Sequence, residues 1–164
     1  MPIIPPFSID FVSRSPEQSR RLGKRLGSLL KTGNVLFLEG DLGSGKTTFV
    51  QGLAQGWGAI DAVSSPTFVL VNQYRRLDGK LMFHLDAYRL ESVPEALDLD
   101  LEEMLANGVL VVEWADRIYD ALPKENLSIH FSWVNEEQRN LVFIPRGERY
   151  KKLLDAFKRL AFGG

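Results

Sequence analysis

The segment GDLGSGKTT, residues 40–48, has the residue types and the spacing that bind phosphate groups. It fits the pattern G-x-x-x-x-G-K-[ST] of nucleotide-binding loops. Its glycines allow a tight turn in which consecutive backbone N–H groups point at one anion, and the positive end of a following helix adds to the attraction. Lys46 is spaced to reach the β- and γ-phosphates, and the Thr47 hydroxyl to ligate Mg²⁺. The segment predicts a nucleoside triphosphate site; the alternative is a plain turn between a strand and a helix. The residues expected around the phosphates are Asp41, Leu42, Gly43, Ser44, Gly45, Lys46, Thr47 and Thr48.

A bound Mg²⁺ needs a carboxylate on its other side, usually at the end of an apolar strand. Glu113 ends the apolar run 109–112. A charge at that point is costly unless it lies at the sheet edge or is paired. If this strand lies beside the strand before the loop, Glu113 emerges next to Thr47 and is the expected second metal ligand. The alternative is a glutamate that only faces water.

Two further residues are candidates for catalysis. Asp86 also follows an apolar run, and could orient the attacking water or share the metal. The alternative is that it only forms an ion pair with Arg89. Thr67, in Ser65-Pro66-Thr67, resembles a switch residue that senses the γ-phosphate. Ser-Pro is also a frequent turn opener, and local spacing alone favours the turn.

Other chemically capable residues have simpler interpretations. His84 and His130 alternate with apolar neighbours, so core or strand-edge positions are expected. Trp114 and Trp133 are expected in the core or in a pocket wall. The basic residues of the first helix fit a solvated face better than an RNA site. They are Arg14, Arg20, Arg21, Lys24 and Arg25.

The elements that must position these residues alternate between strand and helix. Ser15 as N-cap, Pro16 at the first helical position and Gln18 closing a capping box predict a helix that can end at Gly33. The pair Asp78-Gly79 predicts an antiparallel hairpin between two β-like runs. Expected strands cover residues 7–12, 34–39, 68–74, 81–85, 108–114, 127–134 and 140–144, and further helices cover 47–57, 94–106 and 150–162.

These elements predict the α/β class: a P-loop NTPase-like mixed sheet, with a parallel core and antiparallel strands, flanked by helices. The ligand is expected at the carboxyl ends of the strands. The 164 residues are enough for a single domain, 1–164.

Composition limits the possible environments and partners. The net charge of −1 provides no bulk positive field to hold DNA or RNA unaided. The absence of cysteine excludes disulfides, thiolate metal sites and a cysteine nucleophile, and fits a reducing compartment. We find no signal peptide and no membrane-length apolar run, so a cytoplasmic protein that does not enter a membrane is expected.

Two GTPase motifs are absent from the sequence, and their absence indicates the kind of nucleotide. The sequence has neither the Asn-Lys-x-Asp motif that reads guanine nor the Asp-x-x-Gly switch of GTPases. ATP is therefore favoured over GTP.

Four segments in order, GDLGSGKTTF, SPTF followed by Tyr74, HLDAYRL and VEW, make the chain resemble the TsaE (YjeE) family. These are bacterial proteins of threonylcarbamoyladenosine modification of tRNA. The resemblance covers residues from about 15 to about 145. It implies a P-loop α/β fold and a protein that binds ATP with Mg²⁺ and hydrolyses it slowly.

The resemblance also implies partners and roles. Such proteins bind at the junction of TsaB and TsaD, contact tRNA only through that complex, and reset it between catalytic cycles. Thr47 and Glu113 would be Mg²⁺ ligands, Lys46 and Asp86 would act in hydrolysis, and Thr67 would be the switch residue. Ser19, near the base, and Arg139, in a hairpin, are further nucleotide-contact candidates. The alternative function is a small nucleoside or metabolite kinase, although no acceptor pocket or arginine-rich lid is evident.

Overall fold

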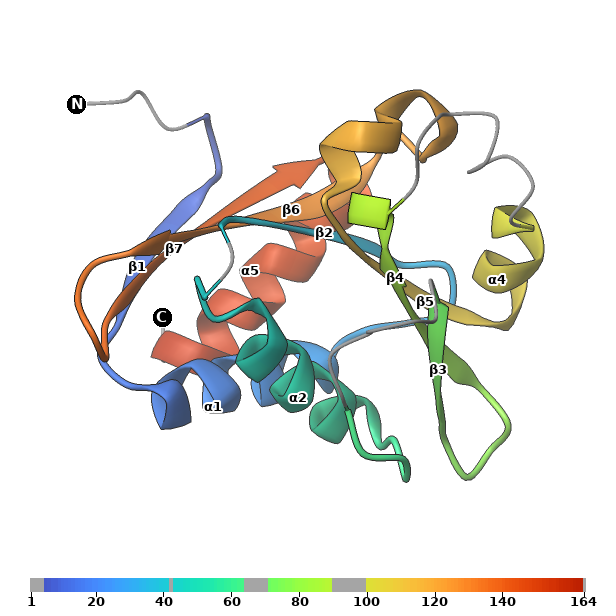
Figure 1. Cartoon of the computed structure of the whole chain (residues 1–164), viewed down its shortest axis with the longest axis horizontal. Coiled ribbons are helices and arrows are strands. Elements are labelled where there is room, and N and C mark those ends of the chain that lie inside the picture. Colours follow the sequence, from blue (N-terminus) through green and yellow to red (C-terminus); the bar gives the residue numbers. More distant parts are fainter. Residues whose placement is uncertain (1–4, 42, 64–70, 90–99, 164) are drawn as a thin grey trace.

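In the computed structural model, a seven-stranded mixed sheet carries helices on both faces (Figure 1). The structure describes residues 5–41, 43–63, 71–89 and 100–163. The strands are β1 (Ile9–Ser13), β2 (Val35–Glu39), β3 (Val71–Arg75), β4 (Leu81–Asp86), β5 (Gly108–Glu113), β6 (Asn126–Trp133) and β7 (Arg139–Arg146). The helices are α1 (Pro16–Gly27), α2 (Lys46–Trp57), α4 (Leu101–Asn107) and α5 (Glu148–Phe162), with 3₁₀ segments η1 (Ala87–Arg89) and η2 (Ala115–Ala121).

The predicted fold class is confirmed by the strand order β1-β7-β6-β2-β5-β4-β3. The four central strands β6, β2, β5 and β4 run parallel, and antiparallel pairing begins at β7 on one side and β3 on the other. Strands β2 and β5 are apolar nearly throughout because helices cover both faces of this core. The antiparallel hairpin predicted around Asp78-Gly79 is present as β3 and β4, and residues 68–70 of the expected first strand lie outside the described residues.

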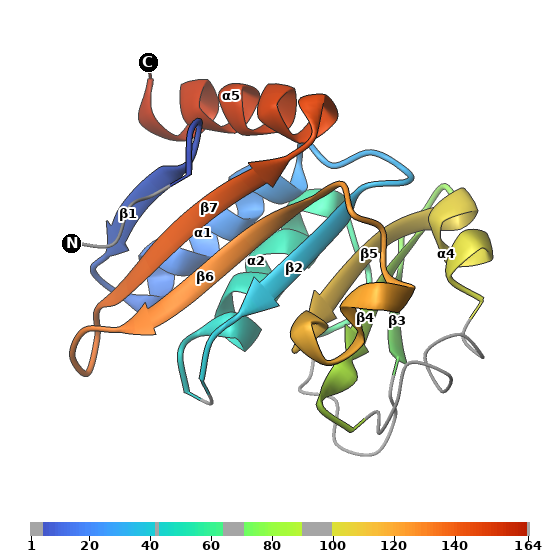
Figure 2. The ribbon, with the colours of Figure 1, turned by 90° about the horizontal axis from the view of Figure 1, so that it is seen from above.

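Two hydrophobic layers hold the helices to the sheet. Helices α1, α2 and α5 cover one face, where they bury residues such as Leu26, Leu53 and Phe157 against alternate strand positions. Segments η2 and α4 cover the other face around Phe37 and Ile118. Figure 2 shows α1 and α2 behind the plane of the strands and the orange η2 in front of it, with α5 along the upper edge beside β1 and β7 and α4 at the side near β5. The sheet is thereby the middle layer of three.

Helix α1 begins as predicted and ends earlier than predicted. The Ser15 hydroxyl accepts a hydrogen bond from the Gln18 backbone N–H at 3.1 Å, and the Gln18 side chain accepts from the Arg14 N–H at 2.7 Å. The helix stops at Gly27, so the end expected at Gly33 is wrong. Leu30 still lies in the core, because the chain keeps turning after Gly27: the Leu29 N–H donates to the Leu26 carbonyl at 3.0 Å and the Leu30 N–H to the Gly27 carbonyl at 3.3 Å.

Helices α1 and α2 touch through their backbones. A Cβ atom built on Gly52 would lie 2.1 Å from the Arg20 carbonyl oxygen, and one on Gly27 would lie 2.2 Å from that of Leu53. Gly23 and Gly56 meet the opposite backbone in the same way. Since α2 begins in the phosphate-binding segment, this contact fixes the helix that carries the loop.

The remaining helices differ from expectation in their ends. Helix α4 covers Leu101–Asn107, and residues 94–99 of the expected helix lie outside the described residues. Helix α5 begins two residues before the expected start at Tyr150. No helix within the described part of the chain is long and apolar enough to span a membrane.

Candidate functional site

The phosphate-binding segment joins the end of β2 directly to α2. Gly40 has a φ of +152°, and a Cβ atom there would lie 2.6 Å from the Phe131 carbonyl oxygen, so a side chain does not fit. Gly45, with a φ of +100°, stands before the first residue of α2 and provides no side-chain cap. The Ser44 N–H donates to the Asp41 carbonyl at 3.0 Å and closes the turn. The segment is therefore a compact loop that ends in an uncapped helix N-terminus.

This loop fits an anionic ligand. The first turn of α2 contains no acidic residue, so its N–H groups and its dipole face no competing negative charge there. The Ser44 hydroxyl is buried and has no hydrogen-bonding partner among the described residues. A buried polar group without a partner is uncommon in proteins, and a phosphate oxygen would satisfy it.

Lys46 lies folded over its own loop. Its ammonium group donates to the Gly40 carbonyl oxygen and lies 4.3 Å from the centre of the Trp114 ring. Burial lowers the pKa of Lys46, and the negative charges of Glu113 and, less strongly, Asp86 oppose this shift. The cation thus lies among the loop, an aromatic ring and the two carboxylates that the sequence singled out.

Those two carboxylates end neighbouring strands. Asp86 of β4 is the register partner of Glu113 of β5, and Glu113 is in turn the partner of Leu38, two residues before Gly40. The expectation that the strand ending in Glu113 lies beside the strand before the loop is therefore confirmed. The Asp86 side chain accepts the Tyr88 N–H at 3.0 Å.

Glu113 does not face water as the alternative interpretation had it. It is only 7% exposed, and its Oε2 atom lies 2.5 Å from Nε2 of His84, which is fully buried. The sequence indicated a core position for His84, but not this partner, which is 29 residues away.

Trp114 has an unusual backbone. Its φ of +60° and ψ of +40° are in the left-handed region, which a bulky residue rarely adopts. Its ring packs on Tyr88, 5.1 Å between centres, and Arg117 lies over Tyr88 at 4.8 Å. Trp114 is partly buried against the hydrophobic core and lies beside Lys46. Trp133 is 60% exposed at the end of β6, so the core position expected for it is wrong.

Glu39, the last residue of β2, is a neighbour of the loop that the sequence analysis did not single out. It accepts a hydrogen bond from the Tyr119 hydroxyl, and its other carboxylate oxygen lies 3.2 Å from Nε2 of His130. These partners come from η2 and β6, so no local pattern could have identified them.

The two further nucleotide-contact candidates, Ser19 and Arg139, differ in their relation to the loop. The Arg139 guanidinium donates to the Gly43 carbonyl of the loop at 3.2 Å and to the Asn135 carbonyl at 2.6 Å. Ser19 is buried at the start of α1. Its hydroxyl forms a hydrogen bond of 2.6 Å with the Ser13 hydroxyl. The structure thus brings Arg139, but not Ser19, into contact with the loop. Leu42 and Thr67 lie outside the described residues.

A Mg²⁺ ion here would depend on few protein ligands. In the ranges that the structure describes, no three His, Asp or Glu side chains gather closely enough to enclose a metal ion. Mg²⁺ is usually held by one or two carboxylates together with phosphate oxygens. The Glu113 carboxylate and the Thr47 hydroxyl are oxygen donors of this kind, so the residues fit a metal that arrives with a nucleotide.

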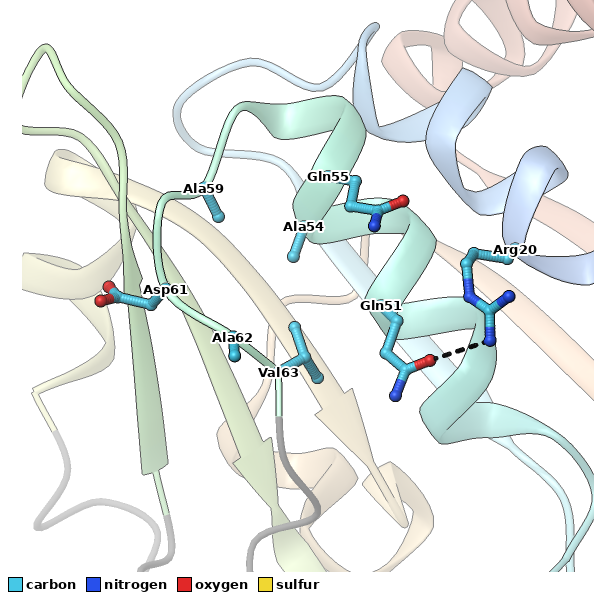
Figure 3. A pocket seen from close by; sticks show the side chains of 8 residues that line it. All are labelled: Arg20, Gln51, Ala54, Gln55, Ala59, Asp61, Ala62 and Val63. Atoms are coloured by element: carbon cyan, nitrogen blue, oxygen red, sulfur yellow. Dashed lines mark hydrogen bonds between the residues drawn. The ribbon is translucent and has the colours of Figure 1, made fainter. Parts of the chain in front are cut away.

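A separate cavity of about 250 Å³ lies between α1, α2 and residues 59–63 (Figure 3). Arg20 donates to Gln51 across its wall at 3.3 Å. Its other lining residues are Ala54, Gln55, Ala59, Asp61, Ala62 and Val63. None of them belongs to the loop or to the carboxylate pair, so this cavity is not part of the predicted phosphate site.

Comparison with known proteins places this geometry in a family. Residues 13–141 match the family described as threonylcarbamoyl adenosine biosynthesis protein TsaE. A Bacillus subtilis protein named tRNA threonylcarbamoyladenosine biosynthesis protein TsaE is 41% identical over 146 residues, which are 88% of this chain and 90% of that protein. A protein of the same name from Streptomyces coelicolor is 39% identical and covers 80% of this chain and 93% of its own.

A solved structure agrees with the sequence comparison. The crystal structure titled Bacillus subtilus YdiB superimposes with a TM-score of 0.76 and 34% sequence identity. The match covers 93% of this chain and 95% of that one.

Proposed function

The chain belongs to the TsaE family, and we propose that it is a single-domain P-loop ATPase that serves the synthesis of threonylcarbamoyladenosine in tRNA. The observation that carries the proposal is the position of Lys46. Its ammonium group lies at an uncapped helix N-terminus and is close enough to Glu113 and Asp86 for both charges to affect its pKa. ATP and Mg²⁺ bring the opposite charges that such a group of cation, backbone donors and carboxylates would bind.

Each residue of the site has its own proposed role in ATP binding and hydrolysis. Backbone N–H groups of residues 43–48 would hold the phosphates, and Lys46 would exchange the Gly40 carbonyl for phosphate oxygens. Thr47 and Glu113 would hold a Mg²⁺ ion, which when bound would supply charge neutralisation on those oxygens. Asp86, which ends the strand next to Glu113, would orient the attacking water. Arg139, already in contact with the Gly43 carbonyl, would close the loop from the β6–β7 hairpin.

Two further assignments rest on the family resemblance. Thr67 would act as the γ-phosphate switch. Ser19 would be a nucleotide contact near the base; its hydroxyl lies 2.6 Å from that of Ser13 and can still accept a further hydrogen bond.

The partners proposed are proteins of the TsaB and TsaD type, with tRNA reached only through them, in the cytoplasm. In this assignment the chain does not carry out the threonylcarbamoyl transfer. Its ATP hydrolysis resets the partner complex between cycles.

The test measures phosphate release from ATP by the purified chain with and without TsaB and TsaD of the same bacterium. Hydrolysis should be slow alone and rise when the partners are added, and Lys46→Ala should abolish it. No complex and no stimulation would refute the proposal. A phosphorylated metabolite in place of free phosphate would instead support the kinase alternative.

A further inference from the structure

Glu113, the carboxylate proposed to hold the metal, is the last member of a buried hydrogen-bonded chain. His84 Nε2 lies 2.5 Å from Glu113 Oε2, and His84 Nδ1 lies 2.9 Å from the Tyr74 hydroxyl. The three residues come from the adjacent strands β3, β4 and β5. We call this arrangement the Tyr74–His84–Glu113 chain.

The chemistry of the groups fixes which atoms donate. An ionised carboxylate only accepts hydrogen bonds, so Nε2 of His84 carries the hydrogen in the bond to Glu113. Burial, the largest cause, raises the pKa of Tyr74, and the charge of Glu113 raises it further against a lowering by Asn72. The Tyr74 hydroxyl therefore keeps its proton and can donate to Nδ1 of a neutral imidazole.

We propose that His84 is a positioning residue for Mg²⁺ binding: it fixes the Glu113 carboxylate by one oxygen and leaves the other to the metal. This inference rests on the proposed function. Oε2 is taken by His84, whereas Oε1 has no hydrogen-bonding partner in the described part of the chain. A glutamate held in one orientation does not lose side-chain freedom when the metal binds. Partners of this kind contribute about 10–100-fold to metal affinity in other proteins.

The competing explanation gives His84 a purely structural task. A carboxylate that is only 7% exposed is costly to bury without a partner, and His84 provides one. In that case loss of the bond lowers the stability of the fold and weakens nucleotide binding alike with and without metal. Positioning predicts a different result, in which only the metal-dependent part of binding changes.

Two amide substitutions separate these explanations. In His84→Gln the amide nitrogen reaches about as far as Nε2, so the bond to Glu113 can form. In His84→Asn the shorter amide reaches only as far as Nδ1 and can bond Tyr74 but not Glu113. Both variants keep a polar group in the same buried place, and each keeps one of the two contacts of His84: Gln the contact with Glu113, Asn the contact with Tyr74.

The experiment uses the full chain and a fluorescent ADP analogue. Its affinity is measured first in EDTA and then during a Mg²⁺ titration, with Mn²⁺ binding by electron paramagnetic resonance as a second readout. For His84→Asn we expect unchanged affinity in EDTA and metal affinity lower by about 10–100-fold. His84→Gln should lose far less metal affinity than His84→Asn, because it keeps the bond to Glu113 and gives up only the bond to Tyr74. His130→Asn, which alters the chain's other histidine, should change neither quantity.

The outcomes are distinguishable. Equal metal affinity in both His84 variants, or a loss already present in EDTA, overturns the positioning role. If Glu113→Gln leaves the Mg²⁺ dependence intact, the proposed metal site itself is wrong. If His84→Asn does not fold, Tyr74→Phe replaces it in the titration; it frees the imidazole and should cause a smaller loss of the same kind, and no loss would refute the proposal.

Discussion

Lys46 is held near its own loop by contacts that depend on the shape of one glycine. Its ammonium group bonds the carbonyl of Gly40, a residue with a φ of +152° whose Cα lies close against Phe131. The Trp114 ring lies on the ammonium group as well. The position of the cation is thus a property of the loop and its walls together.

Replacing Gly40 by Ala should damage both the fold and the site. The new Cβ atom would lie 2.6 Å from the Phe131 carbonyl oxygen at a backbone angle that only glycine adopts easily. We expect the free energy of unfolding to fall by about 2–3 kcal/mol, measured by urea denaturation. Nucleotide affinity should fall as well, since the loop must move.

Gly79→Ala is the matched control. Gly79 also has a positive φ, +88°, but a Cβ atom there meets nothing within 4 Å. Only the backbone strain remains, which costs about 1–2 kcal/mol for a single residue. Losses of equal size at the two positions would mean that the contact with Phe131 does not constrain the loop.

Single residues were predictable where their signal is local. Lys46 and Glu113 were singled out from a motif and from a charge at the end of an apolar run, and the structure pairs the strand that ends in Glu113 with the strand before the loop. The partner of Glu113 was not predictable, because His84 lies on another strand and has the same alternating pattern as an ordinary core residue. Contacts between strands that are far apart in the sequence cannot be predicted from the local spacing of residues.

At the scale of elements, the contact between α1 and α2 decides where the loop lies. The four glycines at this contact have no side chains to adjust, so the two helix backbones meet directly. Packing of this kind tolerates little change, because added methyl groups have no space to occupy.

Gly52→Ala should destabilise the fold, although a glycine-to-alanine change within a helix usually stabilises it. Alanine in place of glycine normally stabilises a helix by about 1 kcal/mol. Here the new Cβ atom would lie 2.1 Å from the Arg20 carbonyl oxygen, and α2 would have to move away from α1. We expect destabilisation by about 1–3 kcal/mol in urea denaturation.

Gln55→Ala, an exposed change on the same helix, serves as reference and should stay within about 0.5 kcal/mol of the wild type. If Gly52→Ala is as stable as this reference, the close contact is not a constraint.

The beginning of α1 was predictable and its end was not. Ser15 and Gln18 form a cap whose partners lie within four residues. The end at Gly27 is hidden because Leu29 and Leu30 continue the apolar spacing, and both pack on the core from beyond the helix. Hydrogen-bonded turns carry the chain from Gly27 to Leu30, so the apolar spacing continues past the last residue of the α-helix.

At the scale of the whole molecule, the parallel core brings the ends of β2, β5 and β4 to one edge, where the loop and both carboxylates meet. A ligand bound there contacts segments that are far apart in the sequence, so its binding energy adds to the stability of the entire fold.

Thermal unfolding should therefore respond to Mg²⁺ and ATP. At a free ligand concentration 100 times the dissociation constant, the free energy of unfolding should rise by about 2.7 kcal/mol, and the melting temperature should rise with it. Lys46→Ala should lose this increase while it keeps the ligand-free melting temperature close to that of the wild type. A wild-type melting temperature that does not change on saturation with nucleotide would contradict a site at the loop.

The strand order also has a consequence for synthesis of the protein. β2 pairs on one side with residues 110–113 and on the other with 127–130, which leave the ribosome long after residues 35–39. The loop therefore emerges early but cannot gain its neighbours until about four-fifths of the chain has been made. Until then the apolar strand before the loop lacks at least one of its two partner strands, and such a segment is a natural substrate for chaperones that bind nascent chains.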